Sequence, residues 1–441
     1  MTTGSKSAKQ TMRPVAFVNA RLLDPASGLD SPGGLLTEDG RILDLGPQLT
    51  ADGLPEGAEV VDCAGQCLAP GLVDIRVQLR EPGEEHKETI ATGSAAAAAG
   101  GVTSMVCLPN TDPVIDDVAG VEFIARRARE TKRAKIYCYG AVTKRLAGKD
   151  LVEMGLLAES GALAFTDGLV AVSDARVMRR ALSYASAFDL LILQHPEEPR
   201  LTEGGAMNAG ELATRLGLSG IPRAAEVMMI ERDLHLVAMT GGRYHAAHVS
   251  TATAIEAIRA AKRQGLRVTC DTAPPYFALN EVAVGDYRTF AKLSPPLRSE
   301  EDREAVAAAV ADGTIDCIAS DHAPHDQESK RVPFAHAAAG GAGLETLLPV
   351  TLELYHKGEA QLLDLLARMT VAPADLLRLP QGRLAKGAPA DLVLFDLEAP
   401  ARIDADRLRG KSKNSPFDGR PVQGRVLRTV VDGRTVFAAE E

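Results

Sequence analysis

Several polar side chains that can bind metal or transfer protons follow short apolar runs of the chain. His195 ends one such run, His248 ends another, and Asp321 directly follows a third. In a parallel α/β barrel the reactive groups lie where strands end, so we expect these three side chains to converge on one point. Two imidazoles and a carboxylate suit a zinc ion. A lone histidine at a strand end is more often an ordinary residue, but three such positions favour a site.

The composition excludes several classes of function. The 441 residues include 49 Lys and Arg against 59 Asp and Glu, which gives a net charge of −10, and this argues against nucleic acid as a partner. No stretch approaches the roughly 18 apolar residues of a membrane helix, and the polar start lacks the apolar core of a signal peptide. The six cysteines are scattered and are expected to be buried free thiols. We therefore expect a cytoplasmic protein that does not associate with membranes.

The elements that must position these residues alternate along the middle of the chain. The pattern predicts strands at 103–108, 134–139, 190–195, 243–248, 267–270 and 315–320, with helices at 118–132 and 252–264. Apolar strands spaced by helices indicate a parallel sheet that is covered on both faces. The span from 67 to 379 has the length of an α/β fold of the (β/α)8 TIM-like barrel type.

The two ends of the chain differ from the middle in their predicted secondary structure. Residues 15–66 and 380–441 contain short strands with turns, among them a hairpin expected to turn at Asp432-Gly433. We predict one small β-domain that is built from both ends and flanks the barrel. Residues 1–14 are interpreted as a flexible tail.

Eight blocks of the chain carry a specific resemblance. They are 71–75 (GLVDI), 79–83 (LREPG), 108–111 (LPNT), 248–251 (HVST), 320–325 (SDHAPH), 343–346 (GLET), 387–393 (GAPADLV) and 413–417 (KNSPF). In this order they resemble the signature of type I dihydroorotases in the amidohydrolase superfamily, from about residue 15 to 437. The resemblance implies the superfamily's (β/α)8 barrel with a small β-domain from both termini, in agreement with the pattern of strands and helices.

The resemblance also implies an activity and a set of roles. Dihydroorotases interconvert carbamoyl aspartate and dihydroorotate, with a zinc-bound water that attacks the ring carbonyl. His195, His248 and Asp167 match metal ligands. Asp321 matches the metal-associated catalytic carboxylate that carries the proton. Four further positions match residues that hold the substrate, which are Arg80, Asn110, Ser294 and His325.

The chain departs from the family pattern around one site. Where the family has His-x-His, the chain has Arg76-Val77-Gln78. Arginine has no usable lone pair and stays protonated, and glutamine is a poor zinc ligand, so at most one zinc ion is expected. One acidic residue is missing beside Asp167, Ser294 replaces a substrate-binding Asn, and Tyr276 replaces a His. We predict that Arg76 points inward and pairs with Asp167, Asp321 or both.

Three functions remain open on the sequence alone. The first, which the losses favour, is an inactive subunit like the dihydroorotase homologues that assemble with aspartate transcarbamoylase. The second is an active dihydroorotase with a reduced site, in which His195, His248 and Asp167 hold one zinc. The third is an amidohydrolase acting on another cyclic amide, such as a hydantoin. A homo-oligomer or a hetero-complex is expected in each case.

Overall fold

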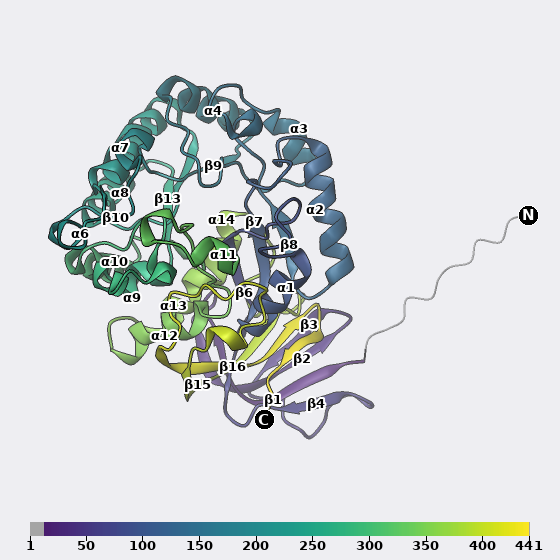
Figure 1. Ribbon diagram of the computed structural model, residues 1–441. Helices are drawn as coiled ribbons and strands as arrows, with labels where there is room; N and C mark the ends of the chain where they lie inside the picture. Colours follow the sequence, from purple (N-terminus) through teal and green to yellow (C-terminus); the bar gives the residue numbers. More distant parts are fainter. Residues whose placement is uncertain (1–12, 441) are drawn as a thin grey trace, which may run out of the picture.

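The chain was studied as a computed structural model that describes residues 13–440 (Figure 1). The predicted tail lies outside the described residues except for Arg13 and Pro14. Among the described residues, no helix is both long enough and apolar enough to cross a membrane.

One sheet joins the two ends of the chain, below the ring of helices in Figure 1. Its strand order is β17-β16-β15-β5-β1-β2-β3, and β4 pairs with β1. The strands are β1 (Val15–Asp24), β2 (Leu29–Glu38), β3 (Arg41–Gly46), β4 (Glu59–Asp62), β5 (Cys67–Pro70), β15 (Leu392–Arg402), β16 (Pro421–Val431) and β17 (Arg434–Ala438). Since β5 belongs to it, the sheet extends past the boundary predicted at residue 66.

Two-residue turns close two hairpins of this sheet. Asp432 and Gly433 join β16 to β17, and Asp39 and Gly40 join β2 to β3; all four have positive φ, at 47°, 72°, 48° and 78°. Tight hairpin turns of this kind favour Asp-Gly, because glycine adopts such backbone angles without steric cost. The predicted hairpin at Asp432-Gly433 is confirmed.

Eight parallel strand segments close into a barrel. Two parallel sheets, β6-β7-β8 and β9-β12-β13-β14, supply seven of them. The eighth is the segment around Phe165, which bridges Gly140 on one side and Ile192 on the other, and a bridge between Val77 and His322 closes the ring. The strands are β6 (Leu72–Val77), β7 (Val102–Cys107), β8 (Lys135–Cys138), β9 (Leu191–Gln194), β12 (Arg243–Ala246), β13 (Val268–Thr272) and β14 (Cys317–Ile318). The predicted barrel is therefore confirmed.

Helices surround the barrel, and each segment predicted as a helix is one. They are α1 (Ile90–Ala99), α2 (Val118–Thr131), α3 (Met154–Glu159), α4 (Ala175–Ala187), α5 (Pro199–Thr202), α6 (Glu211–Leu216), α7 (Ala224–Thr240), α8 (Ala252–Arg263), α9 (Pro274–Ala278), α10 (Glu300–Asp312), α11 (Gln327–Lys330), α12 (Leu347–His356), α13 (Leu362–Met369) and α14 (Val371–Leu376). Side chains cap several of them; the Thr251 hydroxyl accepts from the Ala254 N–H at the start of α8.

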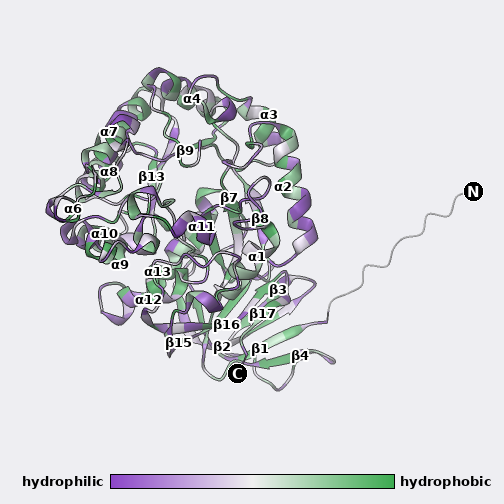
Figure 2. Ribbon diagram, viewed as in Figure 1, coloured by the Kyte–Doolittle hydropathy of each residue, from purple (hydrophilic) through white to green (hydrophobic). Residues whose placement is uncertain are grey.

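The pattern of hydropathy explains how the layers pack. The helices show both purple and green along their length in Figure 2, since one face meets water and the other meets the barrel. All residues of β6 and β7 are buried, as expected for central parallel strands. The strands stay rigid under this packing, so polar side chains at their ends are held in fixed positions. A short strand, β10 (Met207–Asn208), pairs with β11 (Gly220–Ile221) outside the barrel.

Candidate active site at the barrel mouth

The two histidines predicted to bind metal face each other at the ends of β9 and β12. His195 Nδ1 lies 2.7 Å from His248 Nε2, and both rings are buried. The other nitrogen of each ring contacts a carboxylate. His195 Nε2 is 3.1 Å from Glu197 Oε2, and His248 Nδ1 is 3.2 Å from Asp321 Oδ2. The structure thus brings His195, His248 and Asp321 together, as the strand-end argument predicts.

The two carboxylates determine whether the facing nitrogens, His195 Nδ1 and His248 Nε2, act as hydrogen-bond donors or acceptors. A neutral imidazole that donates from one nitrogen has a lone pair on the other. In the tautomers that direct the outer N–H groups at Glu197 and Asp321, His195 and His248 present two lone pairs to each other. Such a contact needs a proton or a cation between the two atoms. Burial, together with the charge of Arg76, lowers the pKa of His248 to about 4, which disfavours the proton.

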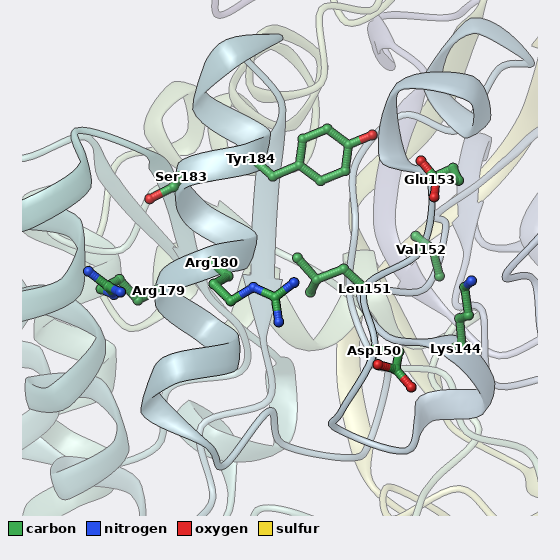
Figure 3. Close-up of a pocket in the computed structure, with 9 residues that line it drawn as sticks. All are labelled: Lys144, Asp150, Leu151, Val152, Glu153, Arg179, Arg180, Ser183 and Tyr184. Carbon is green, nitrogen blue, oxygen red and sulfur yellow. The ribbon is translucent and has the colours of Figure 1, made fainter.

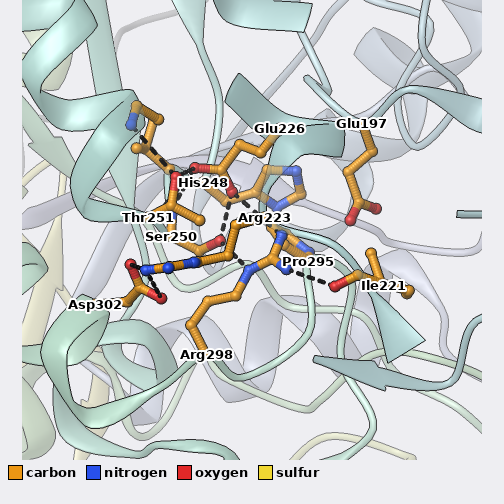
Figure 4. A network of polar contacts seen from close by, with 12 residues as sticks. Glu197, Ile221, Arg223, Glu226, His248, Ser250, Thr251, Pro295, Arg298 and Asp302 are labelled. Carbon is orange, nitrogen blue, oxygen red and sulfur yellow. Dashed lines mark hydrogen bonds and ion pairs between the residues drawn. The ribbon is translucent and has the colours of Figure 1, made fainter. Parts of the chain in front are cut away.

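A buried polar network fixes the backbone beside His248 (Figure 4). The Glu226 carboxylate accepts bonds from the N–H groups of Ser250 and Thr251, at 3.0 Å each, and from both of their hydroxyls. Arg298 donates to the Ser250 hydroxyl at 3.1 Å. The His248 N–H itself donates to Asp271 at 2.7 Å. This network holds His248 at its unusual φ of 37°, which directs the ring into the mouth.

The opposite side of the mouth carries a guanidinium. Arg76 is 1% exposed, and its Nε donates to Asp321 Oδ1 at 2.9 Å. Its Nη2 lies 3.4 Å from the Gly168 carbonyl oxygen. Burial pushes the pKa of Asp321 upward, but the contacts with His248 and Arg76 outweigh this and hold it well below its usual range. The predicted inward pose of Arg76 and its pairing with Asp321 are confirmed.

The Asp167 carboxylate is bound by the loop after β8. Its Oδ1 accepts from the N–H groups of Val142 and Thr143, at 2.8 and 2.9 Å, and its Oδ2 accepts from the Thr143 hydroxyl. The carboxylate therefore anchors the loop after β8 rather than pairing with Arg76. The backbone N–H groups of this loop, which the sequence pattern does not reveal, hold the Asp167 carboxylate.

Of the residues predicted to hold the substrate, Arg80 and His325 contact each other, whereas Asn110 contacts Gln78. Arg80 Nη2 is 3.2 Å from His325 Nε2, and both side chains are largely buried. Asn110 Nδ2 donates to Gln78 Oε1 at 3.1 Å. Burial and the charge of Arg80 lower the pKa of His325 to about 3, so its ring is neutral at neutral pH. A neutral ring beside a guanidinium can accept or donate without repelling an anion.

Two residues of the site were not assigned a role from the sequence. Glu197 lies two residues after His195 and also accepts from Ser294 Oγ at 2.9 Å, so the predicted substrate contact Ser294 is tied to the His195 side. Tyr276 directs its hydroxyl to Pro295 O at 3.1 Å and lies 3.5 Å from Asp321 Oδ2. A Glu two residues after a strand-end His is a signal for Glu197, because carboxylates orient metal-binding imidazoles.

Two family models match the chain. The Dihydro-orotase-like model matches residues 65–254, and the Amidohydrolase family model matches residues 223–437. A dihydroorotase of Anaplasma phagocytophilum is 51% identical, over 97% of this chain and 96% of the relative. Dihydroorotases of Wolbachia sp. subsp. Brugia malayi and Syntrophotalea carbinolica are each 47% identical over 96% of this chain, covering 96% and 99% of those proteins. The chain belongs to the dihydroorotase family.

Solved structures show the same fold in related hydrolases. The L-hydantoinase of Arthrobacter aurescens has a TM-score of 0.86 at 25% identity, covering 98% of this chain and 97% of that one. A dihydropyrimidinase of Brevibacillus agri has a TM-score of 0.82 at 22% identity, covering 96% and 95%. The dihydroorotase-family chain thus shares the barrel and the flanking sheet with these proteins over their whole length.

Membership of the dihydroorotase family implies a metal cofactor, usually zinc. Within residues 13–440, no three or more His, Cys, Asp or Glu side chains form a group that could hold a metal ion. The His195–His248 pair nevertheless fits one ion, because two lone pairs face each other there. The side of the mouth that carries Arg76 fits no metal ion, since the guanidinium of Arg76 and the neutral amide of Gln78 stand where metal ligands would be needed. The donor set is therefore that of at most one ion, with the remaining ligands from water or substrate.

One open cleft of the dihydroorotase-family chain lies away from this mouth (Figure 3). It has a volume of about 600 Å³ and lies between α4 and the loop that leads to α3. Its lining residues are Lys144, Asp150, Leu151, Val152, Glu153, Arg179, Arg180, Ser183 and Tyr184. None of the predicted site residues is among them.

Proposed function

We propose that the chain is a dihydroorotase that interconverts dihydroorotate and N-carbamoyl-L-aspartate in pyrimidine biosynthesis. The observation that carries this proposal is the match to proteins named dihydroorotase, at 46 to 51% identity over 96 to 97% of the chain in the first five relatives. The names of these relatives favour dihydroorotate over a hydantoin as the cyclic amide. The free, buried cysteines are consistent with action in the cytoplasm.

Four residues recognise the substrate carboxylate and its surroundings in this proposal. Arg80 takes the carboxylate with its planar fork, because a guanidinium can form two parallel bonds to it. His325 supports Arg80 through their 3.2 Å contact. Asn110, which bonds to Gln78, and Ser294, which bonds to Glu197, are the further substrate contacts of this proposal. Small movements of Arg80 away from Glu84, which it contacts at 3.0 Å, free its donors for the ligand.

Two imidazoles and one carboxylate perform the remaining tasks. His195 and His248 are the residues that would hold one zinc ion, and the ion would supply acidification of a water and polarisation of a carbonyl. Asp321 is the carboxylate that accepts the proton in this proposal, and its contacts with His248 and Arg76 keep it ionised by holding its pKa well below its usual range. His248 Nδ1 and Arg76 Nε keep the two Asp321 oxygens in place.

Turnover by the pure protein tests this proposal. We expect hydrolysis of L-dihydroorotate and cyclisation of N-carbamoyl-L-aspartate, followed by absorbance of the ring, with loss of both reactions in Asp321→Asn. The matched control is Asp418→Asn, because the Asp418 side chain accepts from the Ala405 N–H, and its backbone carbonyl accepts from the Arg288 side chain. Absence of turnover with zinc supplied would contradict the proposal.

A second function has its own supporting observation. The Arg76–Asp321 ion pair occupies the side of the mouth where the family has two histidines, and this favours a non-catalytic subunit that assembles with aspartate transcarbamoylase. Co-purification of the two proteins without dihydroorotate turnover is the expected result for that function. Turnover by the isolated chain would exclude it.

A further inference from the structure

Two buried donors at the mouth lack a partner among residues 13–440. They are Arg76 Nη1 and Gln78 Nε2, on side chains that are 1% and 3% exposed. Buried donors are nearly always hydrogen-bonded, because leaving one without a partner is unfavourable. Two such donors on neighbouring positions of one strand end point to a ligand oxygen.

The other atoms of both side chains are fixed by the protein. Arg76 uses Nε for Asp321 and Nη2 for the Gly168 carbonyl, which leaves Nη1. Gln78 uses Oε1 as the acceptor for Asn110, which fixes its amide orientation and leaves Nε2 as the free donor. The Gln78 N–H also donates to His322 O at 2.9 Å, which holds this strand end to the barrel.

The two donors belong to one contiguous cluster. Residues two apart on a strand face the same side, so Arg76 and Gln78 both point into the barrel end. Gly168, which binds Arg76, also abuts Asn110, which binds Gln78; a Cβ added to Gly168 would lie 3.2 Å from the Asn110 side chain. The free donors are one charged and one neutral N–H group in a fixed arrangement. This combination suits a planar acyl oxygen of an amide or a carboxylate.

We propose that Arg76 Nη1 and Gln78 Nε2 form an acyl-oxygen subsite, which binds the amide oxygen of the substrate at the bond that is made or broken. This inference rests on the proposed function. Arg76 and His248 bind the two oxygens of Asp321, so an oxygen held by Arg76 lies next to the carboxylate that exchanges the proton. In the open form of the substrate the same donors hold the new carboxylate. Arg80 and His325 remain for the carboxylate that does not react.

Gln78→Glu tests the subsite with minimal change of shape. The variant keeps the acceptor for Asn110 and replaces the free donor by an oxygen that repels an acyl oxygen and can pair with Arg76. We expect L-dihydroorotate to bind at least about tenfold more weakly in calorimetry, while the melting temperature is retained. Arg76→Lys keeps a charge for Asp321 but lacks Nη1, and it should weaken binding in the same direction. Ser104→Ala is the control, because Ser104 Oγ is also buried and unpaired but lies within β7 and has no proposed role.

An infrared measurement identifies the oxygen that is bound. In dihydroorotate labelled with ¹³C at the amide carbonyl that reacts, the stretch should move to lower wavenumber on binding, and Gln78→Glu should reduce this shift. Unchanged affinity and an unchanged carbonyl shift in both variants would overturn the subsite. A loss of affinity with an unchanged amide stretch would also overturn it, because the donors would then hold the other carboxylate. Both readouts need only binding, so absent turnover would contradict the proposed function without deciding the subsite.

Discussion

The two sides of the barrel mouth differ in the source of the positive charge beside their buried polar groups. On one side, His195 and His248 present lone pairs to each other, and Glu197 and Asp321 hold their outer nitrogens. On the other side, Arg76 brings its own positive charge to Asp321 and occupies the strand position where the family has histidine. The first side needs a proton or a cation between the two rings, whereas the second carries a positive charge within the chain.

The Arg76 side shows how a buried carboxylate is stabilised by a charge within the chain. A carboxylate in a poorly solvated pocket without a cation is strongly unfavourable. Arg76 compensates for the charge of Asp321 through its guanidinium.

Restoring the histidines should have the largest effect. Arg76→His with Gln78→His places two imidazoles opposite Asp321, and we expect one more zinc ion per chain by elemental analysis than in the unmodified protein. The binding of structural zinc ions is worth about 10–16 kcal/mol, far more than the other changes considered. Gln78→His alone is the control, because Arg76 would still occupy Asp321. An unchanged zinc content in the double variant would show that the guanidinium does not determine the number of ions.

Removing the internal cation should destabilise the fold. Arg76→Met leaves Asp321 without its guanidinium in a largely buried site, and we expect the free energy of unfolding in urea to fall by about 3 kcal/mol. Arg21→Met is the matched control, because the Arg21–Asp30 pair is more than a third exposed and should contribute less than about 1 kcal/mol. An equal loss of unfolding free energy in the two variants would show that Arg76 does not compensate for the buried charge of Asp321.

A change in the polar network behind His248 should cause the next largest loss of stability. Glu226→Gln retains an oxygen for the Ser250 and Thr251 N–H groups but leaves Arg298 without its carboxylate, and we expect a loss of about 2 kcal/mol in thermal or urea unfolding. Zinc affinity should fall as well, because this network positions His248. Glu256→Gln, in an exposed pair with Arg259, is the control and should change stability by less than about 0.5 kcal/mol. A larger effect in the control would show that burial is not the cause.

A separate prediction concerns Lys330, a buried cation that has no carboxylate partner within residues 13–440. Lys330 donates to the carbonyls of Thr289 and Ala338, and burial, with the nearby charge of Lys292, lowers its pKa to about 7. Its unfolded value is about 10.4, so between these two pH values the unfolded chain binds more protons and stability rises with pH. We expect the unmodified chain to gain stability relative to Lys330→Met between pH 7 and 10. A constant difference across this range would show that Lys330 titrates normally.

Much of the fold could be predicted from the sequence because its signals are local. Apolar runs with polar ends predicted the strands that carry His195 and His248, and Asp432-Gly433 predicted a hairpin that the structure contains. For the segment around Phe165, only the strand end at Asp167 was predicted, without strand bounds, and the segment pairs with its neighbours through single bridges. The boundary at residue 66 was too early, since the pairing of β5 with β15 joins segments more than 300 residues apart and leaves no local signal.

The site was predictable where residue type alone sets the chemistry. Arg76 cannot bind zinc, and its charge led to the correct expectation of a contact with Asp321. The position of the Asp167 carboxylate depends on the backbone N–H groups of Val142 and Thr143. Every residue except proline has such a group, so the sequence could not predict these two partners. Glu226 and Arg298 were not assigned roles because their partners come from distant segments that only the folded barrel brings together, whereas Glu197 lies two residues after its partner His195 and had a local signal.

The most direct test of the difference between the two sides is a crystal structure of the protein grown with zinc, with anomalous data at the zinc edge. The account predicts one peak, between His195 and His248, with Arg76 still bound to Asp321. Two peaks, or one peak beside Asp321 with Arg76 displaced, would contradict it.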